Sequence, residues 1–397
     1  MNVTLVHDWL TGMRGGEKCL DALCRRYPWA ELLTLLHRRG STSAAIERMR
    51  IRASWLNHLP GVTRHYRWLL PLMPQAIESL RVAPDTDLVL SLSHAVAKGV
   101  IAPRGVPHVC YCFTPMRYAW QLRDEYFGPS EQRRSLLGRT RDALLDRVRD
   151  WDLEASQRVT HFIAISRTIA DRISACYGRS STIIYPPTDV EFYTPDPLAR
   201  SREDFYLCVS ALVPYKRLEL AVRACRATGR RLIVIGAGTE LLRLQQVAAE
   251  ERGSGQVDFL GWQSDEVIRD HLRRCRALLF PGNEDFGIVP VEAQACGAPV
   301  IAFNRGGVTE TVLEATATQH GTGVFFEAPT VDALVGAIEW FEAHTEQCDP
   351  QLAREQAERF SLARYETELF NYLERVVDPA LPEPVYETPP KRVRQAA

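Results

Sequence analysis

Two glutamates eight residues apart are the side chains of this sequence best suited to chemistry. Glu284 and Glu292 lie in the segment ALLFPGNEDFGIVPVEAQACGAPVIAFNRGG, which begins at residue 277. An apolar run of strand length precedes Glu284, and a helix predicted to begin at Pro290 places Glu292 in its first turn. A carboxylate offers two acceptor oxygens to a vicinal diol, so we expect Glu292 to hold a ribose and Glu284 the hydroxyls of a second sugar.

Each glutamate also has a plainer interpretation. Glu284 alone is typical of a solvated loop residue, and Glu292 alone of a residue that favours the helix dipole. The loop between them supports a binding role, because the backbone N–H groups from Phe286 to Ile288 are donors for hydroxyl or phosphate oxygens and Gly287 permits close approach. The segment also follows the carboxyl end of a predicted strand, where open α/β sheets bind ligands.

Two further turns between a predicted strand and a predicted helix carry paired glycines. Gly15 pairs with Gly16 near the start of the chain, and Gly306 pairs with Gly307 in its second half. Two consecutive glycines let a phosphate approach the backbone, although such pairs are more often structural. Their recurrence at the same sheet edge in both halves favours a pyrophosphate held between two domains.

A third turn places two cations, Lys216 and Arg217, at a predicted helix start. A cation is unfavourable to the helix dipole at that end, so these residues need another reason to be there. Only four lysines occur in the chain, Lys18, Lys98, Lys216 and Lys391, which makes Lys216 a rare choice.

The acidic pairs and histidines predict no metal site. Asp85 and Asp87 precede a predicted strand instead of following one, and Asp150 and Asp152 lie in a helical stretch after the arginine-rich segment Arg133–Arg149. The histidines form no H-E-x-x-H or comparable cluster. We therefore expect neither a metal nor another cofactor.

The elements that must position these residues alternate along the chain. A length of 397 residues predicts about two or three packed units. Short apolar runs separated by helix-length segments indicate βαβ units, and hence an α/β protein with parallel sheets covered on both faces. The predicted strands are Val3–His7, Leu88–Leu92, His108–Phe113, His161–Ile165, Thr182–Tyr185, Phe205–Val209, Leu232–Ile235, Val257–Leu260, Ala277–Phe280 and Val300–Phe303.

A proline-rich connector divides the predicted fold. We expect a first domain at residues 1–197, a second at 198–360, a C-terminal helix at 361–378 that packs back toward the first domain, and a flexible tail at 379–397.

The composition of the chain indicates which kinds of partner and which cellular compartment to expect. Lys+Arg 48 against Asp+Glu 49 gives a net charge of −1, so no bulk positive field attracts nucleic acid. The closest cysteines, Cys110 and Cys112, alternate along a predicted strand, as buried thiols in a reducing cytosol would. No signal peptide and no apolar run of roughly 18 residues is found. We expect a cytoplasmic protein without a nucleic-acid partner.

One segment leaves contact with a membrane open. Residues 51–84 mix aromatic and apolar side chains, including Trp55, Tyr66 and Trp68, with Arg52 and Arg64. Such a mixture fits both a bilayer surface and an ordinary helix packed on the first sheet.

Together these motifs resemble those of the retaining glycosyltransferases of family 4, which have the GT-B fold of two facing Rossmann-like domains. The resemblance covers nearly the whole chain, and its most specific element is the E-x7-E pattern from Glu284 to Glu292. It implies an acceptor-side first domain and a second domain that binds a nucleotide sugar. It implies that Glu284 contacts the donor sugar, Glu292 the ribose, and Lys216 the diphosphate. The other residues expected at the donor are Gly15, Gly16, Arg217, Phe286, Gly287, Ile288, Gly306 and Gly307.

Within that family, four segments look most like bacterial mannosyltransferases that build O-antigen or exopolysaccharide repeats on lipid carriers. They are SHAVAKG (93–99), YCFTPMRYAW (111–120), YPP (185–187) and VPYKR (213–217). This branch implies GDP-mannose as donor, a saccharide or lipid-linked acceptor, and peripheral contact with the cytoplasmic face of the inner membrane. A UDP-sugar donor, a nucleotide-sugar epimerase and a non-catalytic binding protein stay open as alternatives.

Two positions depart from the family pattern. Ala211 stands where many members carry an arginine, which leaves Arg217 or another group to supply the second positive charge. Phe113 stands where the first domain usually presents a histidine. His94, after the preceding strand, is the nearest candidate to replace it as a catalytic residue, and it equally suits a core histidine.

Overall fold

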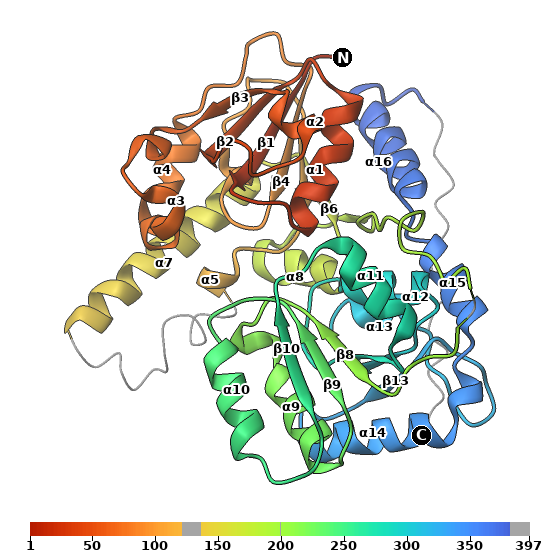
Figure 1. Ribbon diagram of the computed structural model, residues 1–397. Helices are drawn as coiled ribbons and strands as arrows, with labels where there is room; N and C mark the ends of the chain where they lie inside the picture. The colour runs from red at the N-terminus through yellow and green to blue at the C-terminus, as the bar shows by residue number, and fades with distance from the viewer. Residues whose placement is uncertain (121–135, 199, 382–397) are drawn as a thin grey trace.

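The protein has two parallel sheets, one in each half of the chain (Figure 1). The computed structural model describes residues 1–120, 136–198 and 200–381. The first sheet has the order β3-β2-β1-β4-β5-β6-β7 and the second the order β10-β9-β8-β11-β12-β13. The predicted α/β class with parallel sheets is therefore confirmed.

The strands of the first sheet are β1 (Val3–Leu10), β2 (Glu31–His37), β3 (Arg50–Ala53), β4 (Leu88–Ser93), β5 (His108–Cys112), β6 (His161–Ala164) and β7 (Thr182–Ile183). Those of the second are β8 (Tyr206–Val209), β9 (Leu232–Ile235), β10 (Val257–Gly261), β11 (Leu278–Phe280), β12 (Val300–Phe303) and β13 (Gly323–Phe326).

The helices of the first domain are α1 (Gly15–Arg26), α2 (Ala44–Glu47), α3 (Val62–His65), α4 (Met73–Glu78), α5 (Arg117–Trp120), α7 (Leu136–Gln157) and α8 (Arg167–Tyr177), with short 3₁₀ helices η1 (Trp55–His58), η2 (Tyr66–Leu72) and η3 (Ala97–Gly99). Later in the chain follow η5 (Pro214–Lys216), α9 (Leu218–Ala227), α10 (Leu241–Glu250), α11 (Asp265–Arg274), α12 (Ile288–Ala295), α13 (Val308–Thr311), α14 (Val331–Ala343), η6 (Thr345–Gln347), α15 (Pro350–Glu358) and α16 (Leu362–Val377).

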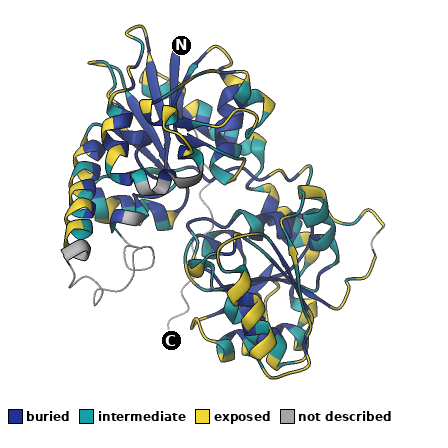
Figure 2. Ribbon diagram, turned by 60° about the vertical axis from the view of Figure 1, so that its left-hand side comes forward, coloured by how far each residue is buried: buried dark blue, intermediate teal, exposed yellow. Residues whose placement is uncertain are grey.

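Both faces of the first sheet are buried. Leu5 and Leu90 belong to one hydrophobic cluster, whereas their chain neighbours Val6 and Val89 belong to another. Because successive side chains of a strand point to opposite faces, helices must cover the sheet on both sides. Figure 2 shows the central strands of the sheets as buried, whereas the edge strands β3, β7 and β10 are partly exposed.

Three strands were not predicted: β2, β3 and β13. In β2 the run ELLTLLH is apolar on nearly every position, which does not by itself distinguish a buried strand from a buried helix. In β3 the run RIRA is too short and polar to stand out; it lies at the sheet edge beside β2, where Arg50 and Arg52 reach an exposed surface.

The order of strands creates a switch point in each sheet. In the first sheet β1 lies between β2 and β4, and in the second β8 lies between β9 and β11. Connections leave such neighbouring strands in opposite directions, which opens a crevice at their carboxyl ends. The loops that follow β1 and β4 carry Gly15 and His94, and those that follow β8 and β11 carry Lys216 and Glu284.

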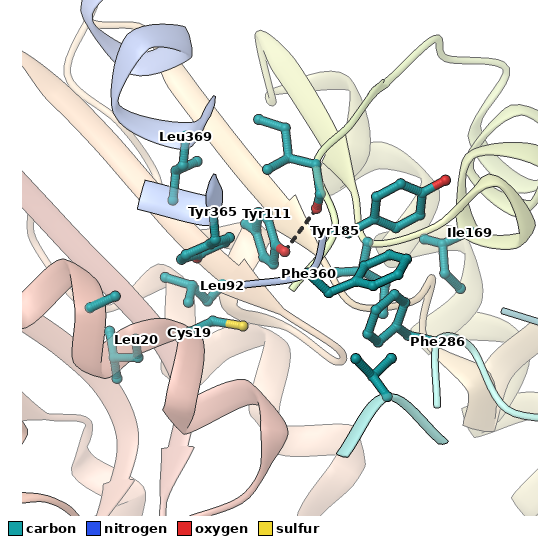
Figure 3. Packing of buried hydrophobic residues seen from close by; sticks show 14 of the residues in the cluster. Cys19, Leu20, Leu92, Tyr111, Ile169, Tyr185, Phe286, Phe360, Tyr365 and Leu369 are labelled. Atoms are coloured by element: carbon teal, nitrogen blue, oxygen red, sulfur yellow. Dashed lines mark hydrogen bonds between the residues drawn. The ribbon is translucent and has the colours of Figure 1, made fainter. Parts of the chain in front are cut away.

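The C-terminal helix α16 lies against the first sheet, so the chain passes between the two halves twice (Figure 1). The Tyr365 ring packs edge-on against Tyr111 with centroids 5.8 Å apart. Figure 3 shows one continuous cluster that runs from α1 and α16 to Tyr185, Phe286 and Phe360. This apolar cluster joins the two domains.

Residues 51–84 pack largely on the first sheet. Tyr66, Leu70 and Met73 are buried in the hydrophobic cluster that contains Val6 and Val89, on one face of that sheet. Trp55 and Leu72 are exposed. Among the described residues no helix is both long and apolar enough to cross a bilayer. The start of the arginine-rich segment, up to residue 135, and tail residues 382–397 lie outside the described residues.

Candidate active site

A cavity lies between the switch points of the two sheets. His94 and the α1 start line it from the first domain, and the loop after β11 lines it from the second. Of the residues proposed from the sequence, it brings together Gly15, Gly16, His94, Glu284, Phe286, Gly287 and Ile288.

Glu284, which lines this cavity, pairs with Lys216, which is not itself a lining residue. The carboxylate of Glu284, after β11, forms an ion pair with the ammonium of Lys216 at the end of η5. Because β8 and β11 are neighbours in the sheet, the loops that follow them deliver these two side chains to one point. An anionic phosphate can replace Glu284 as the partner of Lys216.

The backbone of Gly306 and Gly307 contacts the backbone of the Glu284 loop. The backbone N–H of Gly307 donates to the carbonyl of Glu284 at 2.8 Å. A Cβ on Gly307 would lie 2.4 Å from the Cα of Phe286. The close approach of the two backbones explains this glycine, which lies behind the cavity lining and not in it.

Glu292 lies deeper and contacts the first domain. Its helix α12 begins at Ile288 after Gly287, so the predicted start at Pro290 is wrong and Glu292 lies in the second turn. Its side chain is 6% exposed, and its carboxylate lies 3.3 Å from the Nζ of Lys18 on α1. Burial raises the pKa of Glu292, although the charge of Lys18 opposes that effect.

Lys18 is a residue that the sequence did not single out for the site. Burial lowers the pKa of Lys18, but the charges of Glu292 and Asp265 outweigh burial and raise it overall. The Lys18 ammonium also lies 6.0 Å from the centre of the Tyr193 ring. The expected ribose ligand is thus paired with a cation supplied by the other domain.

Asp285, between the two glutamates, locks the same loop to the first domain. Its carboxylate pairs with Arg117 on α5 and with Arg172 on α8, the latter at 2.5 Å. The hydroxyl of Ser166 donates to the Asp285 carbonyl at 2.6 Å. Both arginines lie more than a hundred positions away in the chain, so no local pattern indicated these contacts.

Glu310 on α13 makes a second polar contact between the domains. Its carboxylate accepts hydrogen bonds from the backbone N–H groups of Arg167 and Thr168 at the start of α8, at 2.8 and 3.2 Å. The hydroxyl of Tyr185 donates to it at 3.0 Å. Burial raises the pKa of Glu310, while these donors oppose that change. Glu310 therefore satisfies a helix N-terminus across the interface.

His94 opens onto the cavity and has a buried acid behind it. Its side chain is 29% exposed, and its Nδ1 lies 3.0 Å from Oδ2 of Asp8, a residue that the sequence did not single out. Phe113 occupies the place of the expected family histidine, with its ring centre 6.4 Å from that of His94. His7, which is buried, also lines the cavity, so His94 is the more exposed of the two imidazoles there.

Arg217 lies apart from this group. Its guanidinium stands over the Phe303 ring at 5.5 Å, and it lines a different hollow with Glu240 and Pro329. Arg217 is also the one non-glycine residue with a positive φ, 52°, in the described part of the chain. Arg14 and Arg117 are the arginines that line the cavity itself.

No group of three or more His, Cys, Asp or Glu side chains suited to a metal ion occurs in residues 1–120, 136–198 and 200–381. Asp152, one of the acids weighed from the sequence, pairs instead with the buried Lys98.

Comparison with known proteins shows that part of the second half of the chain is similar to a known family. Residues 189–359 match the family described as "Glycosyl transferases group 1". The range contains the complete E-x7-E segment and Lys216.

Two curated relatives illustrate the sequence similarity. A GDP-mannose-dependent alpha-(1-6)-phosphatidylinositol monomannoside mannosyltransferase of Mycolicibacterium smegmatis is 30% identical over 198 residues, 44% of this chain and 50% of that protein. A D-inositol 3-phosphate glycosyltransferase of Mycobacteroides abscessus is 32% identical over 147 residues, 33% of each chain. The chain thus spans half or less of the length of these relatives.

Solved structures match over nearly the whole chain. HepE of Anabaena in complex with UDP-glucose is 19% identical with a TM-score of 0.68, covering 94% of this chain and 100% of HepE. The lipopolysaccharide outer core galactosyltransferase WaaB is 17% identical with a TM-score of 0.63, covering 95% and 100%. At this identity the likeness concerns the fold, which is the GT-B architecture of two facing α/β domains.

Proposed function

We propose that this protein is a retaining glycosyltransferase that moves mannose from GDP-mannose to a saccharide or lipid-linked acceptor in the synthesis of a bacterial surface polysaccharide. The observation that carries the proposal is the Glu284–Lys216 ion pair at a cavity between two sheet switch points. It lies in the part of the chain that matches group 1 glycosyl transferases.

Lys216 and Glu284 have separate tasks in this reaction. When the donor binds, its diphosphate takes the place of Glu284 as the partner of Lys216, and Glu284 turns its acceptor oxygens to the sugar hydroxyls. Lys216 then stabilises the negative charge that grows on the diphosphate as the glycosidic bond breaks. The N-terminus of α12 and the glycines at the start of α1 add backbone N–H groups at the same place.

Retention follows if the acceptor hydroxyl attacks on the face that the diphosphate leaves. The bond from the anomeric carbon to the phosphate oxygen breaks, the bond to the acceptor oxygen forms, and the departing phosphate takes the hydroxyl proton. Such a step requires no second carboxylate at the roughly 5 Å spacing of retaining hydrolases. It requires exclusion of water, which the Asp285 and Glu310 contacts support by holding the domains together.

The mannosyl donor is supported by the curated relatives. The Mycolicibacterium protein is named for its dependence on GDP-mannose. HepE was solved with UDP-glucose, and its 19% identity supports the fold alone. A UDP-sugar therefore remains the second candidate donor.

The proposed reaction takes place at the cytoplasmic face of the inner membrane. Trp55, Leu59 and Leu72 expose 42%, 37% and 38% of their surfaces on the first domain, which is the proposed acceptor side. A lipid-linked acceptor would bring that surface to a bilayer. Sedimentation with phosphatidylglycerol vesicles, compared between the wild type and Trp55→Ser, tests this part.

Titration calorimetry and turnover together test the activity. We expect selective binding of GDP and GDP-mannose over UDP and UDP-glucose, and release of GDP when a lipid-linked saccharide is added. Glu284→Ala and Lys216→Ala should each lower kcat by roughly a hundredfold or more. Selective binding of UDP would change the proposed donor to a UDP-sugar and leave the proposed glycosyl transfer unchanged. Normal turnover in both variants would refute the proposal, and conversion of donor without any acceptor would indicate an epimerase.

A further inference from the structure

The turn after β4 is held to β1 by one buried side chain. Asp8 accepts hydrogen bonds from four successive backbone N–H groups, those of His94, Ala95, Val96 and Ala97, at 2.7, 3.0, 2.7 and 2.7 Å. Asp8 is fully buried. Four donors on one carboxylate fix the backbone of the turn, and therefore the point from which the His94 side chain leaves it.

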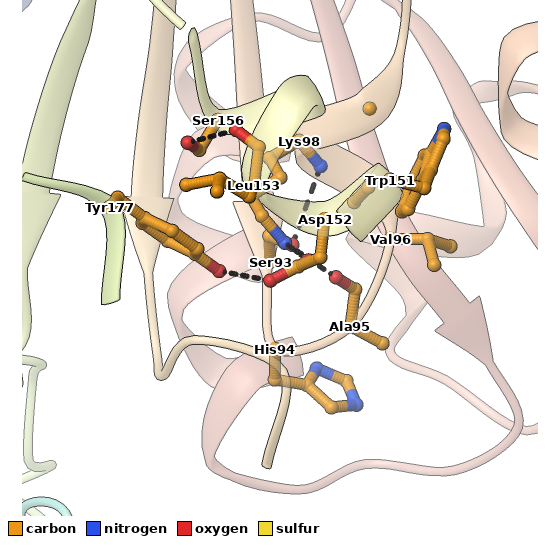
Figure 4. Close-up of polar contacts among 12 residues, drawn as sticks. Ser93, His94, Ala95, Val96, Lys98, Trp151, Asp152, Leu153, Ser156 and Tyr177 are labelled. Atoms are coloured by element: carbon orange, nitrogen blue, oxygen red, sulfur yellow. Dashed lines mark hydrogen bonds and ion pairs between the residues drawn. The ribbon is translucent and has the colours of Figure 1, made fainter. Parts of the chain in front are cut away.

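A second buried acid holds the same turn from the other side. The Lys98 ammonium donates to the carbonyl of Ala95 at 2.8 Å and pairs with Asp152 on α7. Asp152 also accepts from the indole of Trp120 at 2.9 Å and from the hydroxyl of Tyr177 at 2.7 Å. Figure 4 shows the contacts of Asp152 with Lys98 and Tyr177, and the His94 ring pointing away from them. The turn is thus rigid on both sides.

The imidazole of His94 is oriented as well as anchored. Its Nδ1 lies 3.0 Å from Asp8 Oδ2, and its ring stands edge-on to Trp9 with centroids 4.5 Å apart. Burial alone would raise the pKa of Asp8, but the charge and hydrogen bonds of His94 outweigh burial and hold that pKa well below its usual range. An ionised Asp8 accepts only, so Nδ1 carries a hydrogen, and in the neutral imidazole Nε2 is then the acceptor nitrogen.

We propose that Asp8 is a positioning residue of the transfer reaction, which fixes the tautomer of His94 so that Nε2 accepts a hydrogen bond from a hydroxyl of the acceptor sugar. The inference rests on the proposed function. The hydroxyl concerned neighbours the attacking one, whose proton goes to the departing phosphate, so His94 and Asp8 orient the acceptor without a net proton transfer. Phe113 cannot accept such a bond. Of the two imidazoles that line the cavity, His7 is buried beside Glu17, whereas His94 is 29% exposed and has its Nδ1 beside Asp8.

Nitrogen NMR of protein labelled with ¹⁵N-histidine reads the tautomer without any turnover. In alkaline buffer, where imidazoles are neutral, we expect His94 to carry its hydrogen on Nδ1 in the wild type and to lose that preference in Asp8→Asn. His108, whose Nε2 contacts Ser91 Oγ at 2.8 Å, is an internal reference that should not change. Hydrogen on Nε2 of His94 in the wild type, or an unchanged His94 signal in Asp8→Asn, would overturn the proposal.

Kinetics with the acceptor supply a second test. His94→Gln and Asp8→Asn should each lower kcat/KM for the acceptor by roughly tenfold, as expected for one lost hydrogen bond, with the dissociation constant of GDP unchanged. Because Asp8 acts through His94, the double variant should be no slower than His94→Gln alone. Ser91→Ala, which removes the partner of the buried His108, is the matched control and should keep the wild-type rate.

Losses that multiply in the double variant would show that Asp8 does not act through His94. Absence of transfer by the wild type, with the tautomer as expected, would count against the proposed function and not against the dyad.

Discussion

Lys18 on α1 of the first domain and the buried Glu292 on α12 of the second form an ion pair at 3.3 Å. With Lys216 on Glu284, each glutamate of the E-x7-E pattern has a lysine partner, one from each domain. In the proposed reaction, donor binding exchanges these two ion pairs for contacts with the nucleotide sugar. The charge state of Glu292 depends on contact between the two domains, because its cation belongs to the first domain.

Replacing Lys18 should weaken nucleotide binding in a pH-dependent way. In Lys18→Met the buried Glu292 loses its opposing cation, so its already raised pKa rises further and the carboxylate becomes protonated nearer neutral pH. We expect GDP to bind roughly tenfold more weakly at pH 7 and to recover affinity as pH increases. Calorimetry between pH 6 and 9 measures this, with Lys18→Arg as the charge-conserving control. Equal loss at all pH values would contradict the role assigned to Glu292.

Removing Asp285 should destabilise the joined domains. Asp285→Ala leaves Arg117 and Arg172 at the interface without their shared carboxylate, and loss of one partner from a buried pair typically costs about 3–5 kcal/mol. Chemical unfolding measures the change in free energy. Asp258→Ala, which breaks the exposed pair with Arg231, is the matched control and should cost at most about 1 kcal/mol. Similar losses of unfolding free energy in both variants would show that Asp285 contributes no more to stability than an exposed ion pair.

An added methyl group at Gly307 should disturb the Glu284 loop. In Gly307→Ala the new Cβ would meet the Cα of Phe286 at 2.4 Å and the carbonyl of Asp285 at 2.5 Å, so the backbone must move. We expect a lower unfolding midpoint and at least a tenfold weaker affinity for GDP. Gly336→Ala on α14 meets no atom within 4 Å and should stabilise the protein by about 0.5–1 kcal/mol. Unchanged GDP binding by Gly307→Ala would show that the turn at Gly307 does not affect the donor site.

Asp8 should stabilise the folded protein by an amount that decreases in acid. Its pKa in the folded protein lies below the ordinary aspartate value of about 3.9, so the folded state favours the ionised form. The contribution is complete above that value and is lost progressively as pH falls below it. The difference in unfolding free energy between the wild type and Asp8→Asn should therefore be smaller at pH 3 than at pH 5. A difference that stays constant down to pH 3 would refute this assignment.

Transfer should proceed without divalent cations. Lys216 and the backbone donors at the α1 and α12 N-termini are placed to balance the charge of the diphosphate. We expect the rate to be unchanged by EDTA. Loss of activity with EDTA and recovery with Mg²⁺ or Mn²⁺ would show that a metal assists the leaving group.

Sequence patterns predicted the parts of this protein whose partners are near in the chain. The strand before Glu284, the glycines beside it and the last helix at Leu362–Val377 all follow from local composition. The start of α12 was predicted too late, because Gly287 at the N-cap begins the helix before Pro290 can mark it. Lys18, Asp8 and Asp285 have partners at separations of 274, 86 and 113 positions, and no spacing rule connects residues that only the folded domains bring together.

The packing of α16 bears on how the protein is made. Tyr365, Leu369 and Leu373 are fully buried and complete a cluster that contains Leu20, Leu23 and Tyr111 of the first domain. During translation these last residues leave the ribosome after every strand of both sheets. The first domain therefore finishes its core only after the whole second domain has been synthesised, and until then the surface on α1 and β5 that α16 covers stays exposed.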